Sequence, residues 1–150
     1  MKGVELTDAA ERPELVDAVH PLVVAGLRDV PGALAAEPLT LAAWRDWQAV
    51  PSRQPEFLVV ALVDGEAAGF AQLSVYPRVG YHGFTTVVAA HRGRGIARAL
   101  KLELIRRARE RGLERLITQS NEDNVAMRTL NESLGYRPAQ AFVVMRRPAG

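Results

Sequence analysis

The chain of 150 residues contains no cysteine, which excludes disulfide bonds, thiolate metal sites and cysteine nucleophiles. It has no apolar run long enough to cross a membrane, because the longest one, residues 57–63, ends at Asp64. The first residues do not have the pattern of a secretory signal. Hydrophobic residues make up 48% and charged residues 24%, the balance of a soluble globular protein. We therefore expect one cytoplasmic domain over residues 1–150 that does not bind a membrane.

The chain also has little lysine: Lys2 and Lys101 are its lysines, and every other basic side chain is arginine. Arginine holds phosphate with a planar fork, so this composition suits a polyanionic ligand, although a GC-rich coding sequence produces the same bias. The formal net charge is only +2. Four arginines between residues 106 and 111 can suggest nucleic acid, but glutamates interleave with them and favour a solvated helix face. We expect no nucleic-acid partner.

The N-terminal third is predicted to contain a short strand and two helices. Residues 4–6 are the strand candidate, and apolar residues recur at helical spacing over residues 13–27, broken by Pro21. Thr40 is a suitable N-cap for a second helix with Leu41, Trp44 and Trp47 on one side. The two tryptophans can line a substrate pocket or pack in the core, and their spacing favours the core.

The middle of the chain is predicted to form antiparallel strands. Residues 57–63 are rich in strand formers, and Asp64-Gly65 is a strong signal for a two-residue type I′ hairpin turn. Residues 68–76 then form the return strand, residues 77–81 a loop, and residues 82–88 a further strand.

The C-terminal half alternates helices and strands. A long helix from Ile96 carries an apolar stripe and ends at Gly112, a good residue for a helix C-terminus. A strand at 116–120, a helix at 124–134 and a last strand at 141–145 follow. The whole order predicts an α/β fold with a mixed, mostly antiparallel central sheet and helices on its faces.

The segment Arg92-Gly93-Arg94-Gly95-Ile96-Ala97 can bind phosphate, because it stands where a strand runs into a helix. The first amides of a helix lack internal partners, and glycines let a phosphate approach them. A helix start that merely tolerates glycine, with solvated arginines, is the alternative. A dinucleotide fingerprint fits poorly since the third small residue is missing and the segment lies late in the chain. A P-loop needs Gly-Lys-Ser/Thr, which is absent.

Residues 87–97 resemble the acetyl-coenzyme A signature of the GNAT-type N-acetyltransferases, written Arg/Gln-x-x-Gly-x-Gly/Ala, and Arg92, Gly95 and Ala97 fill its named positions. Residues 121–136 look like the second conserved stretch of that family and end in its Leu-Gly-Tyr. The two stretches occur in the family's order and in the expected secondary structure. The likeness extends over about residues 57–147, and the helical N-terminal third fits the family's variable region.

This resemblance implies a strand that splays from its neighbour at residues 87–88 and opens a V-shaped slot for the cosubstrate acetyl-coenzyme A. Backbone groups near Thr86 and Val87 would hold the pantetheine arm and polarise the thioester carbonyl, and the following amides would hold the pyrophosphate. Asn124 occupies a cofactor-contacting position, although it can equally cap a helix. The implied cofactor-binding residues are Thr86, Val87, Val88, Arg92, Gly93, Arg94, Gly95, Ile96, Ala97 and Asn124.

The implied reaction is direct attack of a primary amine, from a small molecule or a peptide, on acetyl-coenzyme A. It requires no metal. The resemblance leaves the protein as a monomer or a homodimer. The alternative is a coenzyme A-binding module with little or no turnover.

Two residues, Asn131 and His82, are candidates for the catalytic steps. Asn131 stands where many relatives have a tyrosine proton donor, and it cannot supply a proton. A thiolate is still a tolerable leaving group, since thiols have a pKa near 8.5. His82, on the strand leading to the slot, is a candidate general base. Alternatively, His82 only packs in the structure, and a chain of water molecules removes the proton from the amine. We expect Tyr136 to pack in the core.

Overall fold

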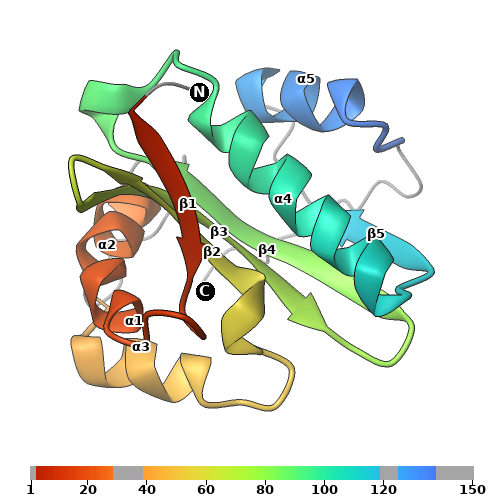
Figure 1. Cartoon of the computed structure of the whole chain (residues 1–150), viewed down its shortest axis with the longest axis horizontal. Helices are drawn as coiled ribbons and strands as arrows, with labels where there is room; N and C mark the ends of the chain where they lie inside the picture. The colour runs from red at the N-terminus through yellow and green to blue at the C-terminus, as the bar shows by residue number, and fades with distance from the viewer. Residues whose placement is uncertain (1–2, 29–38, 119–124, 138–150) are drawn as a thin grey trace, which may run out of the picture. The chain divides into compact units, whose positions relative to one another are not determined.

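The computed structural model describes residues 3–28, 39–118 and 125–137, which fall into two compact units, Met1–Gln119 and Ser120–Gly150. The first unit holds β1 (Val4–Asp8), α1 (Leu15–Ala18), α2 (His20–Arg28), α3 (Leu41–Gln48), the short helix η1 (Pro55–Phe57), β2 (Leu58–Val63), β3 (Glu66–Val75), β4 (Val79–Val87), the short helix η2 (Ala89–His91), α4 (Ile96–Arg111) and β5 (Arg115–Thr118) (Figure 1). The second contains α5 (Val125–Ser133).

The five strands of the first unit form one sheet in the order β1-β2-β3-β4-β5. The pairs up to β4 are antiparallel, whereas β5 runs parallel to β4 and is reached through α4. Helix α4 packs on one face of the sheet, and α1, α2 and α3 pack on the other. The prediction of a mixed, mostly antiparallel sheet with helices on its faces is confirmed.

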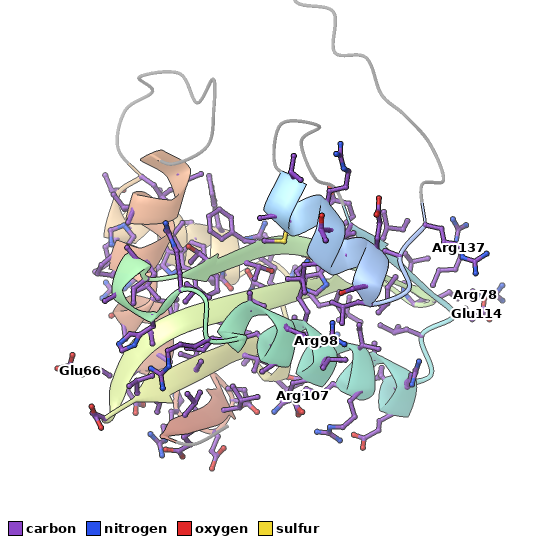
Figure 2. All side chains as sticks on the ribbon, turned by 90° about the horizontal axis from the view of Figure 1, so that it is seen from above. Glu66, Arg78, Arg98, Arg107, Glu114 and Arg137 are labelled. Carbon is purple, nitrogen blue, oxygen red and sulfur yellow. The ribbon has the colours of Figure 1, made fainter. Side chains whose placement is uncertain are left out.

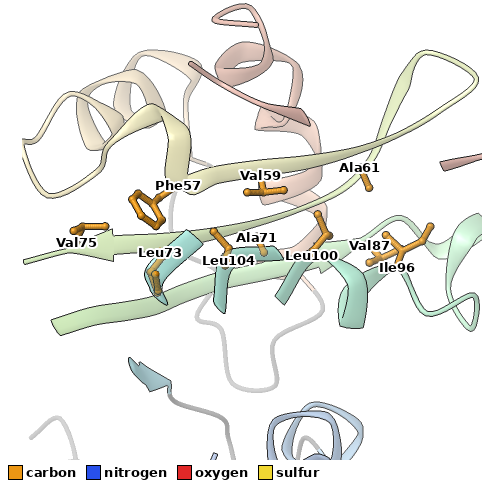
Figure 3. Close-up of a cluster of buried hydrophobic side chains, with 11 residues drawn as sticks. Phe57, Val59, Ala61, Ala71, Leu73, Val75, Val87, Ile96, Leu100 and Leu104 are labelled. Atoms are coloured by element: carbon orange, nitrogen blue, oxygen red, sulfur yellow. The ribbon is translucent and has the colours of Figure 1, made fainter. Parts of the chain in front are cut away.

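One core lies between α4 and the sheet, where alternate residues of β2 and β3 meet the helix (Figure 3). Its helical side is the predicted apolar stripe, formed by Ile96, Leu100, Leu104 and Ala108, all of them buried. Gly112 ends α4 in the left-handed conformation, with φ 82°, as predicted. The position of α4 over the sheet therefore follows from its sequence periodicity.

An ion pair with Asp8, at the end of β1, also holds α4 in place. Arg107, labelled in Figure 2, donates to the carboxylate of Asp8 at 2.7 Å and to that of Glu103 at 2.9 Å. Burial alone would raise the pKa of Asp8, but hydrogen bonds from the Glu11 amide and Arg107 outweigh it and lower that pKa. The contact between Arg107 and Asp8 joins α4 to the end of β1, although the two residues are far apart in the chain.

Local signals in the N-terminal third gave mixed results. Thr40 caps α3 by accepting from the Ala43 amide at 3.1 Å, as predicted. The helix break predicted at Pro21 occurs two residues earlier: α1 ends at Ala18 and α2 begins at His20, so Pro21 lies in the first turn of α2. Proline fits there because the amide it lacks would have no intrahelical partner. Trp44 is 2% exposed, whereas Trp47 is 49% exposed, so the shared core position expected for both holds only for Trp44.

The hairpin between β2 and β3 is the predicted type I′ turn, with φ values of 52° at Asp64 and 81° at Gly65. The loop predicted over residues 77–81 is wrong, since β4 already begins at Val79. The Tyr76 amide donates to the Val79 carbonyl at 2.9 Å and closes a much shorter turn.

Helix α5 is followed by Gly135 at a positive φ of 95°, which agrees with the predicted end of that helix. The strand predicted at 141–145 and Asn124 lie outside the described residues. None of the helices in the described residues is long and apolar enough to span a bilayer.

The close approach of β3 to β4 gives a stability prediction at Gly69. A Cβ at Gly69 would lie 2.9 Å from the Thr86 carbonyl oxygen, which is backbone and cannot move away cheaply. We expect Gly69→Ala to lower the free energy of unfolding by about 1–3 kcal/mol. Gly83→Ala is the matched control, because nothing lies within 4 Å of its Cβ position and its φ is not positive. Urea denaturation of both variants checks this, and equal losses would contradict the packing described.

Candidate functional site

The pairing of β4 changes partway along the strand. Its first residues pair with β5, from Val79 opposite Arg115 to His82 opposite Thr118. Beyond His82, β4 continues to Val87, whereas the described part of β5 ends at Thr118. Within the residues that the structure describes, the far half of β4 is therefore paired with β3 alone. One edge of β4 is left turned toward the place where the resemblance puts a cofactor.

The hydrogen bonds show which backbone groups face that edge. The Val88 amide donates to the Ala68 carbonyl at 2.8 Å, so Gly69 and Val87 form a non-hydrogen-bonded pair of the antiparallel ladder. The backbone of Thr86 then points to β3, and the backbone of Val87 points away from it. Consistent with this, the Val87 carbonyl accepts from Nε of Arg92 at 3.0 Å. Of the two residues predicted to offer backbone groups, Val87 has its amide on the open edge.

A bulge in β4 decides which side chains face which helix. Gln72 pairs with Phe84, but Leu73 pairs with His82, so Gly83 is an extra residue. One extra residue reverses the alternation of side chains along a strand. His82 therefore shares the α4 face with Leu73, while Phe84 shares the other face with Gln72.

The segment after β4 brings the predicted phosphate-binding residues together at the start of α4. Gly93 and Gly95 both have φ of 80°, the left-handed conformation that favours glycine. The first intrahelical bond runs from the Ala99 amide to the Gly95 carbonyl at 3.0 Å, so the Ile96 and Ala97 amides lie ahead of it. These amides, the positive end of the helix dipole and the nearby arginines form an anion-binding arrangement.

Two arginines of this segment also shape it. Arg92 bridges back to the end of β4 through the Val87 carbonyl, and Nη1 of Arg94 lies 2.9 Å from Nδ1 of His91. Both side chains are exposed, so their cationic groups remain at the surface of the loop. The structure thus brings Val87, Val88 and residues 92–97 into one continuous strand–loop–helix segment.

The interior beside β4 contains two polar side chains, His82 and Lys101, which are 3% and 2% exposed. Burial, and then the charge of Lys101, lower the pKa of His82 to about 3. Burial lowers the pKa of Lys101 to about 8. His82 is therefore a packed, neutral histidine, and so weak a base is poorly matched to proton abstraction near neutral pH.

Sequence reasoning did not select Lys101 as a site residue. It follows Leu100 on α4, and Ala97 and Ile105, one turn away on either side, are both apolar and partly buried. A lysine at the border of an apolar stripe, in a chain whose other basic residues are almost all arginines, was the available signal. Burial of its ammonium group could not be predicted because it depends on contacts between elements that are far apart in the chain.

The second unit holds the remaining candidates. Asn131 is 4% exposed, and its backbone carbonyl accepts a hydrogen bond from the Tyr136 backbone amide at 3.0 Å. Tyr136 is half-buried, and burial raises the pKa of its phenol to about 12. The Tyr136 phenol is therefore a much weaker acid than a thiol, and the Asn131 amide is not an acid at all.

Comparison with known protein families gives a match that includes the strand–loop–helix segment. The family model described as "Acetyltransferase (GNAT) family" matches residues 26–136. No curated protein sequence matches the chain significantly.

Among solved structures, the chain is similar to an N-acetyltransferase from Staphylococcus aureus Mu50, with 23% identity, 91% of this chain and 85% of that chain covered, and a TM-score of 0.77. A ribosomal-protein-alanine N-acetyltransferase from Brucella melitensis biovar Abortus 2308 has 22% identity, coverage of 97% and 99%, and a TM-score of 0.70. An aminoglycoside N-acetyltransferase solved with coenzyme A has 18% identity, coverage of 97% and 94%, and a TM-score of 0.64. At these identities the likeness establishes the fold.

The buried lysine predicts an unusual pH dependence of stability. Its pKa falls from 10.5 in the unfolded chain to about 8 in the folded protein, so the unfolded chain binds more protons between these values. Stability should therefore rise with pH, by about 2 kcal/mol between pH 7.5 and 9.5 from this group. Lys101→Met should lack that rise. Urea denaturation of both proteins at several pH values measures the difference, and parallel pH curves would contradict the burial of the ammonium.

Proposed function

The chain belongs to the acetyltransferase (GNAT) family, and we propose that it transfers the acetyl group of acetyl-coenzyme A to a primary amine of a small molecule or a peptide by direct attack. Acetyl transfer and the use of acetyl-coenzyme A are properties of the family. The observation that carries the proposal is the open edge of β4 running directly into the glycine-rich start of α4.

The chemical groups of this strand–loop–helix segment suit the parts of acetyl-coenzyme A. Left-handed glycines at 93 and 95 leave space beside the Ile96 and Ala97 amides, where a pyrophosphate would be held. Arg94 adds positive charge there. The Val87 amide, turned away from β3, would bind the extended arm of the cosubstrate as a further strand would. Arg92 acts through the Val87 carbonyl and fixes the loop, in addition to its own charge.

The chemistry supplied by the cosubstrate is a thioester, whose carbonyl carbon accepts a nucleophile. The protein must hold that carbonyl and admit a neutral amine. It must also accept the proton that the nitrogen loses and supply the proton that the sulfur gains. A preorganised backbone donor aimed at the developing oxyanion contributes about 3–4 kcal/mol in acyl transfer. We assign that task to amides of the open β4 edge. Neither a protein nucleophile nor a metal enters this scheme.

The acceptor is proposed to approach from the face of β4 that carries Phe84. The Phe84 ring stacks on Phe70, with centroids 5.6 Å apart and planes 4° from parallel. Helix α2 comes close here, since a Cβ at Gly26 would lie 3.1 Å from the Thr86 hydroxyl and 3.2 Å from the Phe84 ring. The N-terminal helices, in the variable region of the family, thus shape the acceptor side.

A coenzyme A-binding module with little turnover is the second candidate. The specific observation in its favour is that His82, the one histidine on β4, is buried with a pKa of about 3 and makes a weak base. The two candidates share the cofactor site and differ only in turnover.

The cofactor site is tested by thermal denaturation with acetyl-coenzyme A. A ligand at a hundredfold excess over Kd stabilises the folded protein by about 2.7 kcal/mol, which raises Tm. Gly95→Glu should abolish most of that rise, because its carboxylate would repel and block the phosphates. Gly65→Glu is the matched control: it places the same side chain at nearly the same φ, 81° against 80°, in the distant hairpin turn. Equal rises in the two variants would contradict the assigned site.

Turnover is tested by measuring thiol release from acetyl-coenzyme A with a panel of primary amines, from small polyamines and aminoglycosides to peptides with free N-termini. We expect at least one amine to give thiol and N-acetylated product in equal amounts. Stabilisation by acetyl-coenzyme A without thiol release from any amine would favour the binding module.

A further inference from the structure

We propose that Lys101 is the proton donor of the reaction and delivers a proton from Nζ to the coenzyme A sulfur as the acetyl group leaves. This inference rests on the proposed function and adds a residue that neither the signature segment nor the sequence analysis assigns to the reaction. It concerns a lysine that is 2% exposed on α4.

The first argument is position. The stripe of Ile96, Leu100 and Leu104 packs on β2 and β3, and Lys101 is rotated from Leu100 by about 100° around α4. Lys101 also lies about 200° around α4 from Glu103, which binds Arg107 beside Asp8 of β1. It is therefore on the side of α4 away from β1, toward β4 in the sheet order, and its charge acts on His82. His82 forms the last pair between β4 and β5, opposite Thr118. Lys101, enclosed by protein at 2% exposure, is thus on the side of α4 toward the strand whose edge is open beyond His82.

The second argument is length. The strand from Val87 back to His82 covers roughly 17 Å at about 3.4 Å per residue. The pantetheine arm between pyrophosphate and sulfur is an extended chain of similar length. An arm held at the start of α4 and laid along the open edge of β4 would thus end with its sulfur near His82 and Lys101.

The third argument is acidity. A proton donor works best when its pKa is close to that of the group it serves, and thiols have a pKa near 8.5. Lys101, with a pKa of about 8, meets this requirement, whereas His82 at about 3 is already neutral and Tyr136 at about 12 holds its proton too tightly. The titratable group with which Lys101 interacts electrostatically in the first unit is His82 from β4, and Arg98 lies one turn earlier on α4 and is exposed.

The proton balance closes without another reagent. The amine nitrogen bonds to the carbonyl carbon, the carbon–sulfur bond breaks, and its electron pair stays on sulfur. Protonated Lys101 gives one proton to that sulfur and becomes a neutral amine. It regains a proton from the attacking nitrogen, which loses one on becoming an amide. Lys101 thus returns to its starting state, and no proton is gained or lost overall.

The absence of cysteine in the chain permits a direct test by chemical replacement. Lys101→Cys can be alkylated in denaturant and refolded, either with bromoethylamine, which restores an amine at lysine length, or with iodoacetamide, which leaves a neutral group. Leu102→Cys, at a neighbouring residue that is 45% exposed, carries the same two groups as the matched control. Wild-type protein passes through the same treatment.

We expect Lys101→Met and the iodoacetamide-treated Lys101→Cys to lose about 10²- to 10⁴-fold in kcat, with KM for acetyl-coenzyme A changed only a few-fold. The aminoethylated Lys101→Cys should recover at least about tenfold of that loss, and both forms of Leu102→Cys should match wild type. The decline of kcat above about pH 8 that a lysine donor produces should disappear in Lys101→Met.

A binding measurement gives a readout that does not depend on turnover. The thiol of bound coenzyme A is titrated by the ultraviolet absorbance of its thiolate, in wild type and in Lys101→Met. A cation at the sulfur should lower the thiol pKa in wild type by about one unit or more relative to the variant. Equal thiol pKa values, or a folded aminoethylated protein no faster than the iodoacetamide form, would overturn the Lys101 proposal alone. Failure of wild type to bind coenzyme A would overturn the proposed function and this proposal with it.

Discussion

Strand β4 has hydrogen-bonding partners on both sides only as far as His82, within the part of the chain that the structure describes. Every later feature of the site depends on that one constraint. A strand edge needs partners for its amides and carbonyls, and the Val87 carbonyl already takes one from Arg92. The Val87 amide faces the same way. The edge is therefore prepared for an extended ligand, and the loop after it ends in helix amides that suit phosphate.

The bulge at Gly83 adds a second consequence to the same strand. By reversing the side-chain alternation, it turns His82 toward α4 and leaves Phe84 and Thr86 on the face of the N-terminal helices. The open edge of β4 thus lies between the α4 face, where His82 is buried, and an aromatic face beneath α2 and α3. Burying the ammonium group of Lys101 costs hydration that its interactions with the protein must offset, and proton transfer at the sulfur is the role that we propose for it.

Much of the fold was predictable because its signals are local. The type I′ hairpin follows from Asp64-Gly65, the α3 cap from Thr40, and the buried stripe of α4 from helical spacing. The candidate phosphate-binding segment could be selected for the same reason, since its glycines and arginines are consecutive. The errors came where distant contacts decide. The turn before Val79 is shorter than its proline and glycine content suggested, and the orientation of His82 depends on a bulge that no local pattern announces. Trp47 is exposed because α3 presents only one tryptophan to the sheet. The burial of Lys101 likewise depends on tertiary packing.

The account can be tested most directly at the amide of Val87, by residue-specific hydrogen exchange measured by nuclear magnetic resonance with and without acetyl-coenzyme A. In the free protein the Val87 amide, which faces away from β3, should exchange faster than the Thr86 amide, which faces β3. Acetyl-coenzyme A should slow exchange at Val87, and at Ile96 and Ala97, by more than it slows Thr86. A Val87 amide that responds no more than Thr86 would show that the cosubstrate does not lie along the open edge of β4.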